Sequence, residues 1–441
     1  MKFFKRILLT LSTGYILYFY SEWIFWSFAR PEDTLLDYIL TPLVYSFFAY
    51  AFLIIIDEFR ARNIWAIFIA GAAFGWIAEG IYAMTIFETE VISLSWTGLA
   101  WHALIGVLIG WYYLRKILEE NRYLKTIVFS LLVGAFWGIW SVAWALETPP
   151  IVTTPDIYLL QGLFITAFFI LSQWVFSKSN SFEFHASRKE KIFVLIILIA
   201  FFLALTVPYM KVISVILPVL FYLLYLILKK NKNSERRESV LTEIGGPVRW
   251  RNLLLLFIMP ITAALIYNFM NSAGLIFRTN LFIMIISTAA GFIMFAVSAI
   301  KILGTANRYN SNMISTKTLK YILFILVFPS LMGEIFISGG SPITVLLNPA
   351  TWFWFILSYG IPILFIREAW VRLNLNVLAV LIWGVAYGIF NEGIIAQTLT
   401  QLNGDPAGAF IGYGTIFGIH LSWATFILTF HALFSVLTPI L

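Results

Sequence analysis

Long apolar runs are the feature that most constrains this chain. About fourteen segments hold roughly twenty mainly apolar residues each, the length of an α-helix that crosses a bilayer core. Hydrophobic residues make up 61% of the 441 residues and charged residues only 12%, which excludes a soluble fold. The sequence therefore predicts an all-α, polytopic membrane protein whose main partner is the lipid bilayer.

Short polar stretches separate the predicted helices. These helices run over residues 7–28, 37–56, 64–85, 92–114, 126–146, 157–176, 192–207, 212–228, 252–270, 281–300, 321–338, 350–366, 375–397 and 416–439. With the N-terminus inside, every Lys and Arg except Arg30, Lys211 and Arg278 falls on the inner side. This positive-inside pattern predicts a multi-pass protein of the cell membrane with both termini in the cytoplasm.

Four short motifs near the start of the chain recur in the same order near its end. The pairs are SEWIFW (21–26) with GEIFIS (333–338), LTP (40–42) with LNP (347–349), FGWIAEGI (74–81) with YGIFNEGI (387–394), and LAWHALIG (99–106) with LTFHALFS (428–435). Shared order and spacing predict a duplicated four-helix unit with parallel topology. The expected segments are a first repeat at 1–120, middle helices at 121–228, a basic cytoplasmic linker at 229–251, further middle helices at 252–314, and a second repeat at 315–441.

The third helix of each predicted repeat carries a glutamate behind two glycines. The two sets, whose members stand four positions apart, are Gly71, Gly75 and Glu79, and Gly384, Gly388 and Glu392. Residues four apart share one helix face, and glycines on that face let a neighbouring helix approach closely. We therefore expect Glu79 and Glu392 to face another helix rather than lipid.

A histidine in the fourth helix of each predicted repeat completes a polar group. His102 lies on a glycine stripe, and His431 is its counterpart. By helix rise, Glu22 and Glu79 lie about 9 Å and His102 about 15 Å below the outer membrane surface, so these three side chains can meet. Glu334 and Glu392 lie at similar or shallower depth.

The composition excludes several kinds of site. The chain has no cysteine, which removes thiol nucleophiles, disulfides and Cys-ligated metals. The net charge of +7 comes from the cytoplasmic loops, so we expect no nucleic-acid partner. No cofactor is predicted, while a metal ion held by glutamate and histidine stays open.

Two further motifs combine with the glutamates and histidines to suggest a family. DEFRAR (57–62) places Glu58 and Arg62 in an acidic frame with a downstream arginine, and REAWVR (367–372) does the same with Glu368 and Arg372. The order of these motifs resembles the superfamily of glutamate-dependent intramembrane proteases. That superfamily includes PrsW-type proteases, CAAX-processing proteases and the non-catalytic Aph subunit of gamma-secretase. The stretch GAAFGWIAEGIYA (71–83) and the His-Ala-Leu helices are similar to PrsW-type segments.

The resemblance implies a carboxylate that activates water against a peptide bond inside the membrane. Glu58 or Glu368 would be the base, and the glutamate and histidine of the same repeat would complete the site. The helix boundaries, however, put Glu58 at the inner end of its helix, where both acidic–arginine motifs also fit ordinary cytoplasmic loops.

Three functions therefore fit the sequence. The first is an intramembrane peptidase of the glutamate type, or a degenerate relative, that acts on membrane-embedded peptides. The second is a transporter or channel in which Glu79 and Glu392 carry protons or cations. The third is a membrane scaffold whose acids only hold helices together.

Overall fold

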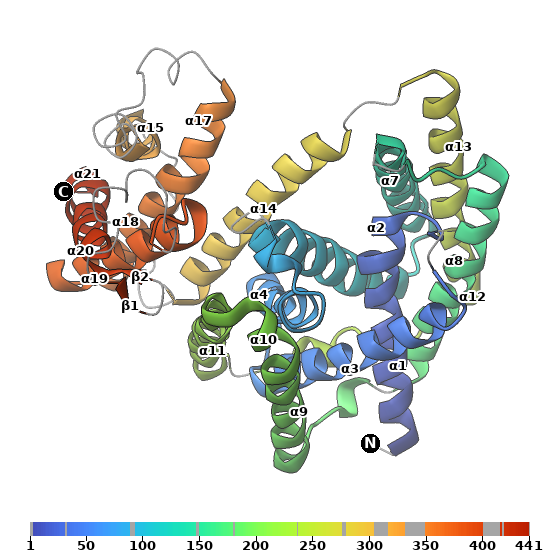
Figure 1. The fold of residues 1–441 in the computed structure, drawn as a ribbon. Coiled ribbons are helices and arrows are strands. Elements are labelled where there is room, and N and C mark those ends of the chain that lie inside the picture. Colours follow the sequence, from blue (N-terminus) through green and yellow to red (C-terminus); the bar gives the residue numbers. More distant parts are fainter. Residues whose placement is uncertain are drawn as a thin grey trace. The chain divides into compact units, whose positions relative to one another are not determined.

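The computed structural model describes residues 3–30, 33–88, 93–146, 150–179, 181–235, 237–275, 279–303, 316–330, 349–399, 415–416 and 419–440. Its contacts divide the chain into two compact units, Met1–Ile302 and Leu303–Leu441. Figure 1 follows the chain through both units. The predicted middle helices at 121–228 fall inside the first unit.

Twelve of the described helices are long and apolar enough to cross a membrane, against the fourteen predicted. The first and eleventh predicted spans account for the difference. The first helix forms, but its serine, threonine, tyrosine and glutamate residues lower its mean hydropathy. The eleventh is described only as the shorter apolar helix Lys320–Ser330.

Helices dominate the first unit. Its elements are α1 (Phe3–Tyr18), η1 (Phe19–Trp23), α2 (Ile24–Trp26), α3 (Asp37–Glu58), α4 (Ile64–Trp76), η2 (Ile77–Tyr82), η3 (Thr85–Phe87), η4 (Leu94–Tyr113), α6 (Leu114–Glu119), α7 (Tyr123–Ser141), η5 (Val142–Leu146), α8 (Pro155–Lys178), η6 (Ser181–Glu183), α9 (Arg188–Phe201), η7 (Phe202–Thr206), α10 (Val207–Met210), η8 (Lys211–Val215), α11 (Ile216–Ser234), η9 (Val240–Thr242), α12 (Trp250–Leu254), η10 (Leu255–Phe257), α13 (Ile258–Ser272) and α14 (Thr279–Leu303). Of the η elements, η1, η2, η4 and η7 are π-helical and the others are 3-10 turns.

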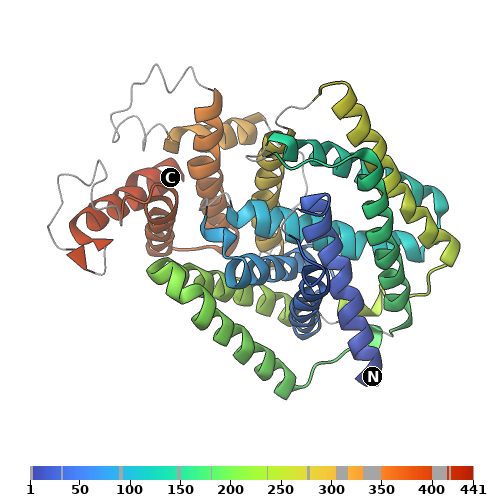
Figure 2. The same cartoon turned by 45° about the vertical axis from the view of Figure 1, so that its right-hand side comes forward.

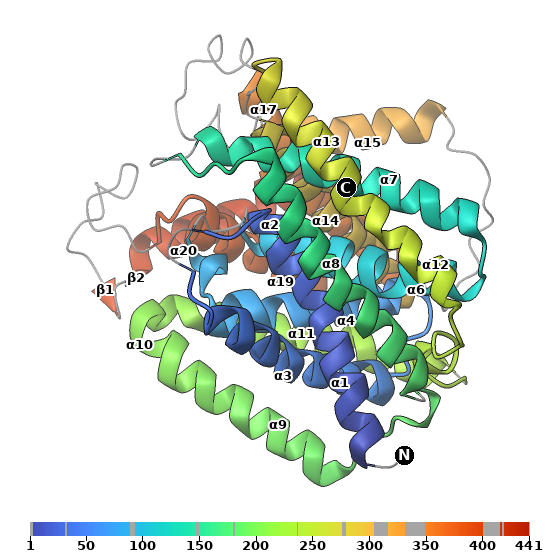
Figure 3. The ribbon, with the colours of Figure 1, turned by 90° about the vertical axis from the view of Figure 1, so that its right-hand side faces the viewer.

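Helix α4 lies at the centre of this unit, and its residues from Ala66 to Trp76 are all buried. It packs along η4 and against α3 and α11. Helices α1, α8, α13 and α7 make successive contacts beside it, and Figure 3 shows α8 and α13 side by side. Gly134 and Gly138 of α7 lie against backbone carbonyls of α13, so that pair is close-packed. Helix α9 lies at the edge of the unit in Figure 2 and is mostly exposed, as a lipid-facing helix would be.

The loops predicted to be cytoplasmic meet on one side of the first unit. Glu58 at the end of α3 binds both Lys191 and Lys232. Arg62 pairs with Glu243 in the predicted linker. These contacts place the loops around 57–63, 177–191 and 229–251 together, as the positive-inside pattern predicts for loops on one face.

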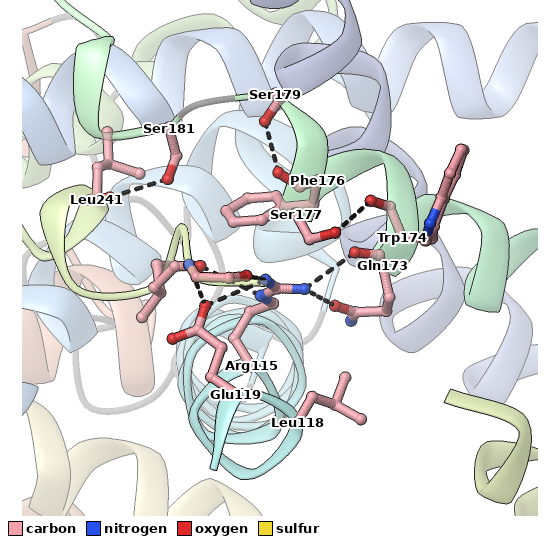
Figure 4. A network of polar contacts seen from close by, with 12 residues as sticks. Arg115, Leu118, Glu119, Gln173, Trp174, Phe176, Ser177, Ser179, Ser181 and Leu241 are labelled. Carbon is pink, nitrogen blue, oxygen red and sulfur yellow. Dashed lines mark hydrogen bonds and ion pairs between the residues drawn. The ribbon is translucent and has the colours of Figure 1, made fainter. Parts of the chain in front are cut away.

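Residues 239–249 of the predicted linker form a folded segment of the first unit. Val240 and Ile244 are fully buried, and the Val240 amide donates to the carbonyl of Ala61 at 2.9 Å. Figure 4 shows the Arg115 side chain beside this segment. Arg115 is also fully buried. Its guanidinium donates to the carbonyls of Ile244 (3.2 Å) and Gly246 (3.0 Å).

Further contacts satisfy the rest of the Arg115 guanidinium. It donates to the Gln173 carbonyl of α8 at 2.9 Å and to the Glu119 carboxylate at 3.1 Å. A buried charge is tolerated only when it is paired and fully hydrogen-bonded, and this one is. The arginine therefore ties η4 and α6 to α8 and to the folded segment.

The second unit contains α15 (Thr316–Ser330), α17 (Pro349–Phe355), η12 (Ile356–Gly360), α18 (Ile361–Leu373), α19 (Val377–Phe390), η13 (Asn391–Ile395), β1 (Thr415–Ile416), β2 (Ile419–His420), α20 (Leu421–Phe430), η15 (His431–Leu437) and α21 (Thr438–Ile440). The two short strands pair antiparallel, Thr415 with His420 and Ile416 with Ile419. Helix α19 packs along α20 and the π-helix η15. The hydrophobic core of the second unit contains Ile363, Val380 and Val436.

Candidate functional site

A glutamate and a histidine form the centre of a buried polar cluster in the first unit. The Glu79 carboxylate meets Nε2 of His102 at 2.5 Å, and its other oxygen accepts from the Thr85 hydroxyl. Nδ1 of His102 lies 2.8 Å from the Ser21 hydroxyl. Glu79 is 9% exposed and His102 1% exposed. Glu79 and His102 therefore point into the unit, as the glycine spacing predicts. Ser21 and Thr85 are hydrogen-bonding partners of this pair.

Glycines and π-helical turns position this pair. A side chain at Gly71 would meet the Cα atom of Ala103 at 3.1 Å, and one at Gly75 would overlap the Gly98 carbonyl, so α4 and η4 touch backbone to backbone. Glu79 follows on the π-helix η2, and His102 lies within the π-helix η4. Such π-helical segments are rare and occur frequently at functional sites.

A second carboxylate lies beside the pair. Glu22 accepts from the Tyr45 hydroxyl at 2.6 Å and from Nε1 of Trp26 at 3.1 Å. The Tyr45 ring centre is 6.3 Å from the ring centre of His102. Since Tyr45 and Ser21 both lie beside His102, Glu22 is near the Glu79–His102 pair, and its own hydrogen bonds go to Tyr45 and Trp26.

Glu22 lines a small polar cavity of about 50 Å³. Arg30, Asp33 and Asp37 also line it, and Asp37 is exposed, so the cavity reaches the surface of the unit. A site of this polarity and volume can hold ordered water. The first cluster therefore has one carboxylate that can meet water and one that is shielded from it.

An apolar groove adjoins the polar cavity. It has a volume of about 580 Å³, shares Tyr18, Trp23 and Tyr38 with the cavity, and continues between α1, α3 and α8. A neighbouring hollow of about 330 Å³ shares Tyr15 and Ile39 with it. Aromatic and aliphatic side chains dominate both, which suits a hydrophobic chain.

The second unit contains a cluster of the same composition. The Glu392 carboxylate lies 2.9 Å from Nε2 of His431 and accepts from the Thr398 hydroxyl. Nδ1 of His431 lies 3.0 Å from the hydroxyl of Ser435. Glu392 and His431 are 7% and 1% exposed, and both belong to π-helices, η13 and η15.

The surroundings of the two histidines also correspond. The Phe74 ring centre lies 5.5 Å from that of His102, edge to face, and the Tyr387 ring centre lies 5.4 Å from that of His431 in the same way. A side chain at Gly384 would meet the Ala432 Cα atom at 2.6 Å. Gly388 lies against His431 itself.

Both acidic–arginine motifs stand apart from these clusters. The Glu58 carboxylate binds Lys191 and Lys232, and Arg62 binds Glu243. Glu58 also lies thirteen residues beyond Tyr45 on α3, about 20 Å by helix rise. The structure therefore does not bring Glu58 to Glu79 and His102, because α3 is one continuous helix that ends at the loop side.

The motif of the second unit is likewise engaged with its own arginines. Glu368 meets Arg367 at 2.5 Å and Arg372 at 2.9 Å, all three on α18. Its side chain is about a quarter exposed. The remaining predicted residue, Glu334, lies outside the described residues.

The clusters combine general acid–base groups without an assembled metal site. Among the described residues, no group of three His, Asp or Glu side chains could hold a metal ion. A glutamate in contact with a histidine can exchange protons, and a hydroxyl on the other ring nitrogen fixes the orientation of the ring. Sequence reasoning missed Ser21, Tyr45, Thr85 and Thr398. The two threonines had a detectable signal, because each stands six residues after its glutamate.

Comparison with known proteins agrees with the membrane architecture. A family model described as an uncharacterized membrane protein family matches residues 322–441, a range inside the second unit. No curated protein and no solved structure matches the chain. The chain is thus an integral membrane protein whose second unit is similar to a membrane protein family.

Proposed function

We propose that this protein is an intramembrane hydrolase of the glutamate type that cleaves membrane-embedded peptides. The observation that carries the proposal is the placement of Glu22 beside the Glu79–His102 pair, at a cavity large enough for water. Hydrolysis requires water, a base and a donor for the developing oxyanion within one site. The resemblance of the glutamate and His-Ala-Leu helices to glutamate-dependent intramembrane proteases points to the same chemistry.

The roles follow from the contacts. Glu22, the carboxylate that meets the cavity, takes a proton from water, and the resulting hydroxide attacks the peptide carbonyl. Tyr45, which donates to Glu22 in the resting state, would donate to the oxyanion during the reaction. The proton held by Glu22 then passes to the leaving amine, so peptide and water give an acid and an amine. Glu79 and His102 orient one another and maintain the charge balance of the site.

The apolar groove between α1, α3 and α8 is the proposed route for the substrate. A hydrophobic peptide segment would lie in the groove, with its scissile bond at the shared wall of Tyr18, Trp23 and Tyr38. Burial of apolar side chains along the groove supplies binding energy. The polar cavity beyond that wall supplies the water.

Peptide cleavage in proteoliposomes tests the proposal. Fluorogenic peptides with one hydrophobic segment should be cleaved by the wild type, and cleavage should fall at least 100-fold in Glu22→Gln and in Glu79→Gln. Glu58→Gln is the matched control, because that side chain lies with Lys191 and Lys232. Loss of cleavage in Glu58→Gln with retention in Glu22→Gln would refute the assignment.

Proton-coupled transport is a second function that one observation favours. Glu79–His102 and Glu392–His431 are buried ionisable pairs on membrane-spanning helices, a feature typical of proton relays. Proteoliposomes that contain a pH-sensitive dye would detect proton flux under an imposed gradient. Flux that is lost in both Glu79→Gln and Glu392→Gln, without peptide cleavage, would establish transport instead.

We also propose that the two clusters descend from one duplicated four-helix unit whose chain termini lie in the cytoplasm. Asn63 and Asn376 support this proposal, because each caps the helix sixteen residues before its glutamate. Cysteine labelling of an exposed loop residue such as Arg122 from either side of the membrane tests the orientation, since the chain has no native cysteine. Labelling only from outside would contradict it.

A further inference from the structure

The hydroxyl that contacts each histidine comes from a different place in the two units. Ser21, on the π-helix η1, reaches Nδ1 of His102 from another helix, across 81 positions of sequence. Ser435 reaches Nδ1 of His431 from four residues farther along the same π-helix. The contact distances, 2.8 and 3.0 Å, are nevertheless alike.

Glycine occupies the alternative position in the first unit. Gly106 stands four residues after His102, as Ser435 stands four residues after His431. A Cβ atom at Gly106 would lie 3.3 Å from the Ser21 hydroxyl oxygen, so the two positions face the same space. The sequence shows the reciprocal exchange, because Glu334 follows Gly333 where Glu22 follows Ser21. The first repeat thus has serine before its first-helix glutamate and glycine four residues after its histidine, and the second repeat has glycine and serine at these two positions.

We infer that Ser21 and Ser435 are positioning residues that hold each imidazole with its proton on Nε2, directed at the glutamate. A carboxylate facing Nε2 requires a proton on that nitrogen, because two bare acceptors repel one another. Nδ1 is then a bare acceptor inside the protein and needs a donor. The serine hydroxyl donates to it. The exchange between helices indicates that the hydroxyl itself, and not the residue that carries it, is what the site requires.

Nitrogen NMR of the histidines tests this inference directly. The chain has only four histidines, so ¹⁵N-histidine labelling in nanodiscs gives few signals, which His102→Gln and His431→Gln assign. We expect Nδ1 of His102 to resonate as an unprotonated nitrogen, and Ser21→Ala to shift that signal by several parts per million or more. A protonated Nδ1 in the wild type would overturn the inference.

Relocating the hydroxyl provides the sharper test. Ser21→Gly should shift the Nδ1 signal of His102, and the double variant Ser21→Gly/Gly106→Ser should return it toward the wild-type position. Gly106→Ser alone should lower the thermal midpoint, because its side chain crowds Ser21, and the Ser21→Gly background should remove that loss. Ser12→Ala is the control, since it removes a buried hydroxyl of α1 that donates to the Leu9 carbonyl.

Amide hydrogen exchange in the helices of residues 3–302 reports whether the first unit of each variant remains folded. If exchange there is unchanged and the double variant fails to restore Nδ1 of His102, the inference is wrong. The inference concerns the site of the proposed hydrolase, and the purpose of holding the imidazole in this way rests on that proposed function. Its readout is the protonation of a ring nitrogen, so it can fail while peptide cleavage stands, and cleavage can fail while it stands.

Discussion

The two glutamate–histidine clusters share their contacts but differ in what surrounds them. In the first unit Glu79 and His102 have a second carboxylate, Glu22, and a polar cavity beside them. In the second unit the Thr398 hydroxyl also accepts from Nε1 of Trp423 at 2.9 Å. The glutamate–histidine pair with its threonine and serine is thus common to both units. The comparison indicates that both pairs are held in the same way, and that in the first unit the pair lies beside a polar cavity.

The largest effect is expected from Arg115→Met, which should destabilise the first unit alone. Removing one partner of a buried, hydrogen-bonded ion pair costs about 3–5 kcal/mol. Amide hydrogen exchange should rise in helices of residues 3–302 and stay constant in α18 and α19. Arg122→Met is the control, because that side chain is 69% exposed. A uniform rise across both units would show that they unfold together.

Glu79→Gln and Glu392→Gln should have matching effects. Each removes the charge that accepts from a threonine and a histidine, and hydrogen bonds to charged groups contribute about 1.5–3 kcal/mol. Unfolding of the two variants in mixed detergents measures the loss. Agreement within about 1 kcal/mol would strengthen the comparison, and a wider gap would mean that the neighbours, not the pair, dominate.

Gly71→Ala and Gly384→Ala should lower the thermal midpoint by different amounts, because the glycines of the two units are packed to different degrees. An added methyl group would lie 3.1 Å from the Ala103 Cα atom in the first case and 2.6 Å from the Ala432 Cα atom in the second. Overpacking costs about 1–3 kcal/mol, so we expect Gly384→Ala to lower the thermal midpoint more. Gly393→Ala, whose nearest neighbour lies at 3.4 Å, is the control. The reverse order would show that helix contacts in the second unit relax more easily.

The smallest effect is expected from Glu58→Gln and Glu368→Gln. Both side chains form partly exposed ion pairs on the loop side, and such pairs contribute about 0–1 kcal/mol. Thermal midpoints should therefore change little. A loss above about 2 kcal/mol in either variant would mean that the acidic–arginine motif has a structural role that its exposure does not suggest.

The membrane fold and the inward direction of the glutamates could be predicted from sequence. Apolar length specifies a spanning helix, and the four-residue spacing of Gly71, Gly75 and Glu79 specifies a packed face. The placement of Glu58 could not be settled by its motif. An acidic pair followed by arginine fits a catalytic frame and a charged loop equally well, and only the continuity of α3 decides between them.

Ser21 and Arg115 escaped prediction for a different reason. The Ser21 hydroxyl acts across two helices that lie far apart in sequence, and one serine carries no periodicity. Arg115 counts as one more inner positive charge until the segment 239–249 folds over it. Both roles depend on contacts between distant parts of the chain, which helix spacing does not encode.

The Arg115 contacts also set an order of events during synthesis. The carbonyl of Gly246 is made 131 residues after the arginine that binds it. At ribosomal rates of about 5–20 residues per second, that interval is roughly 7–26 s. During this interval the Arg115 guanidinium must remain hydrated. Helix α6 therefore cannot reach its final buried position until translation has passed residue 246. The folded segment therefore sets the earliest moment at which Arg115 can be buried, and the first unit is completed later still, when α13 has been made and packs on α7 and α8.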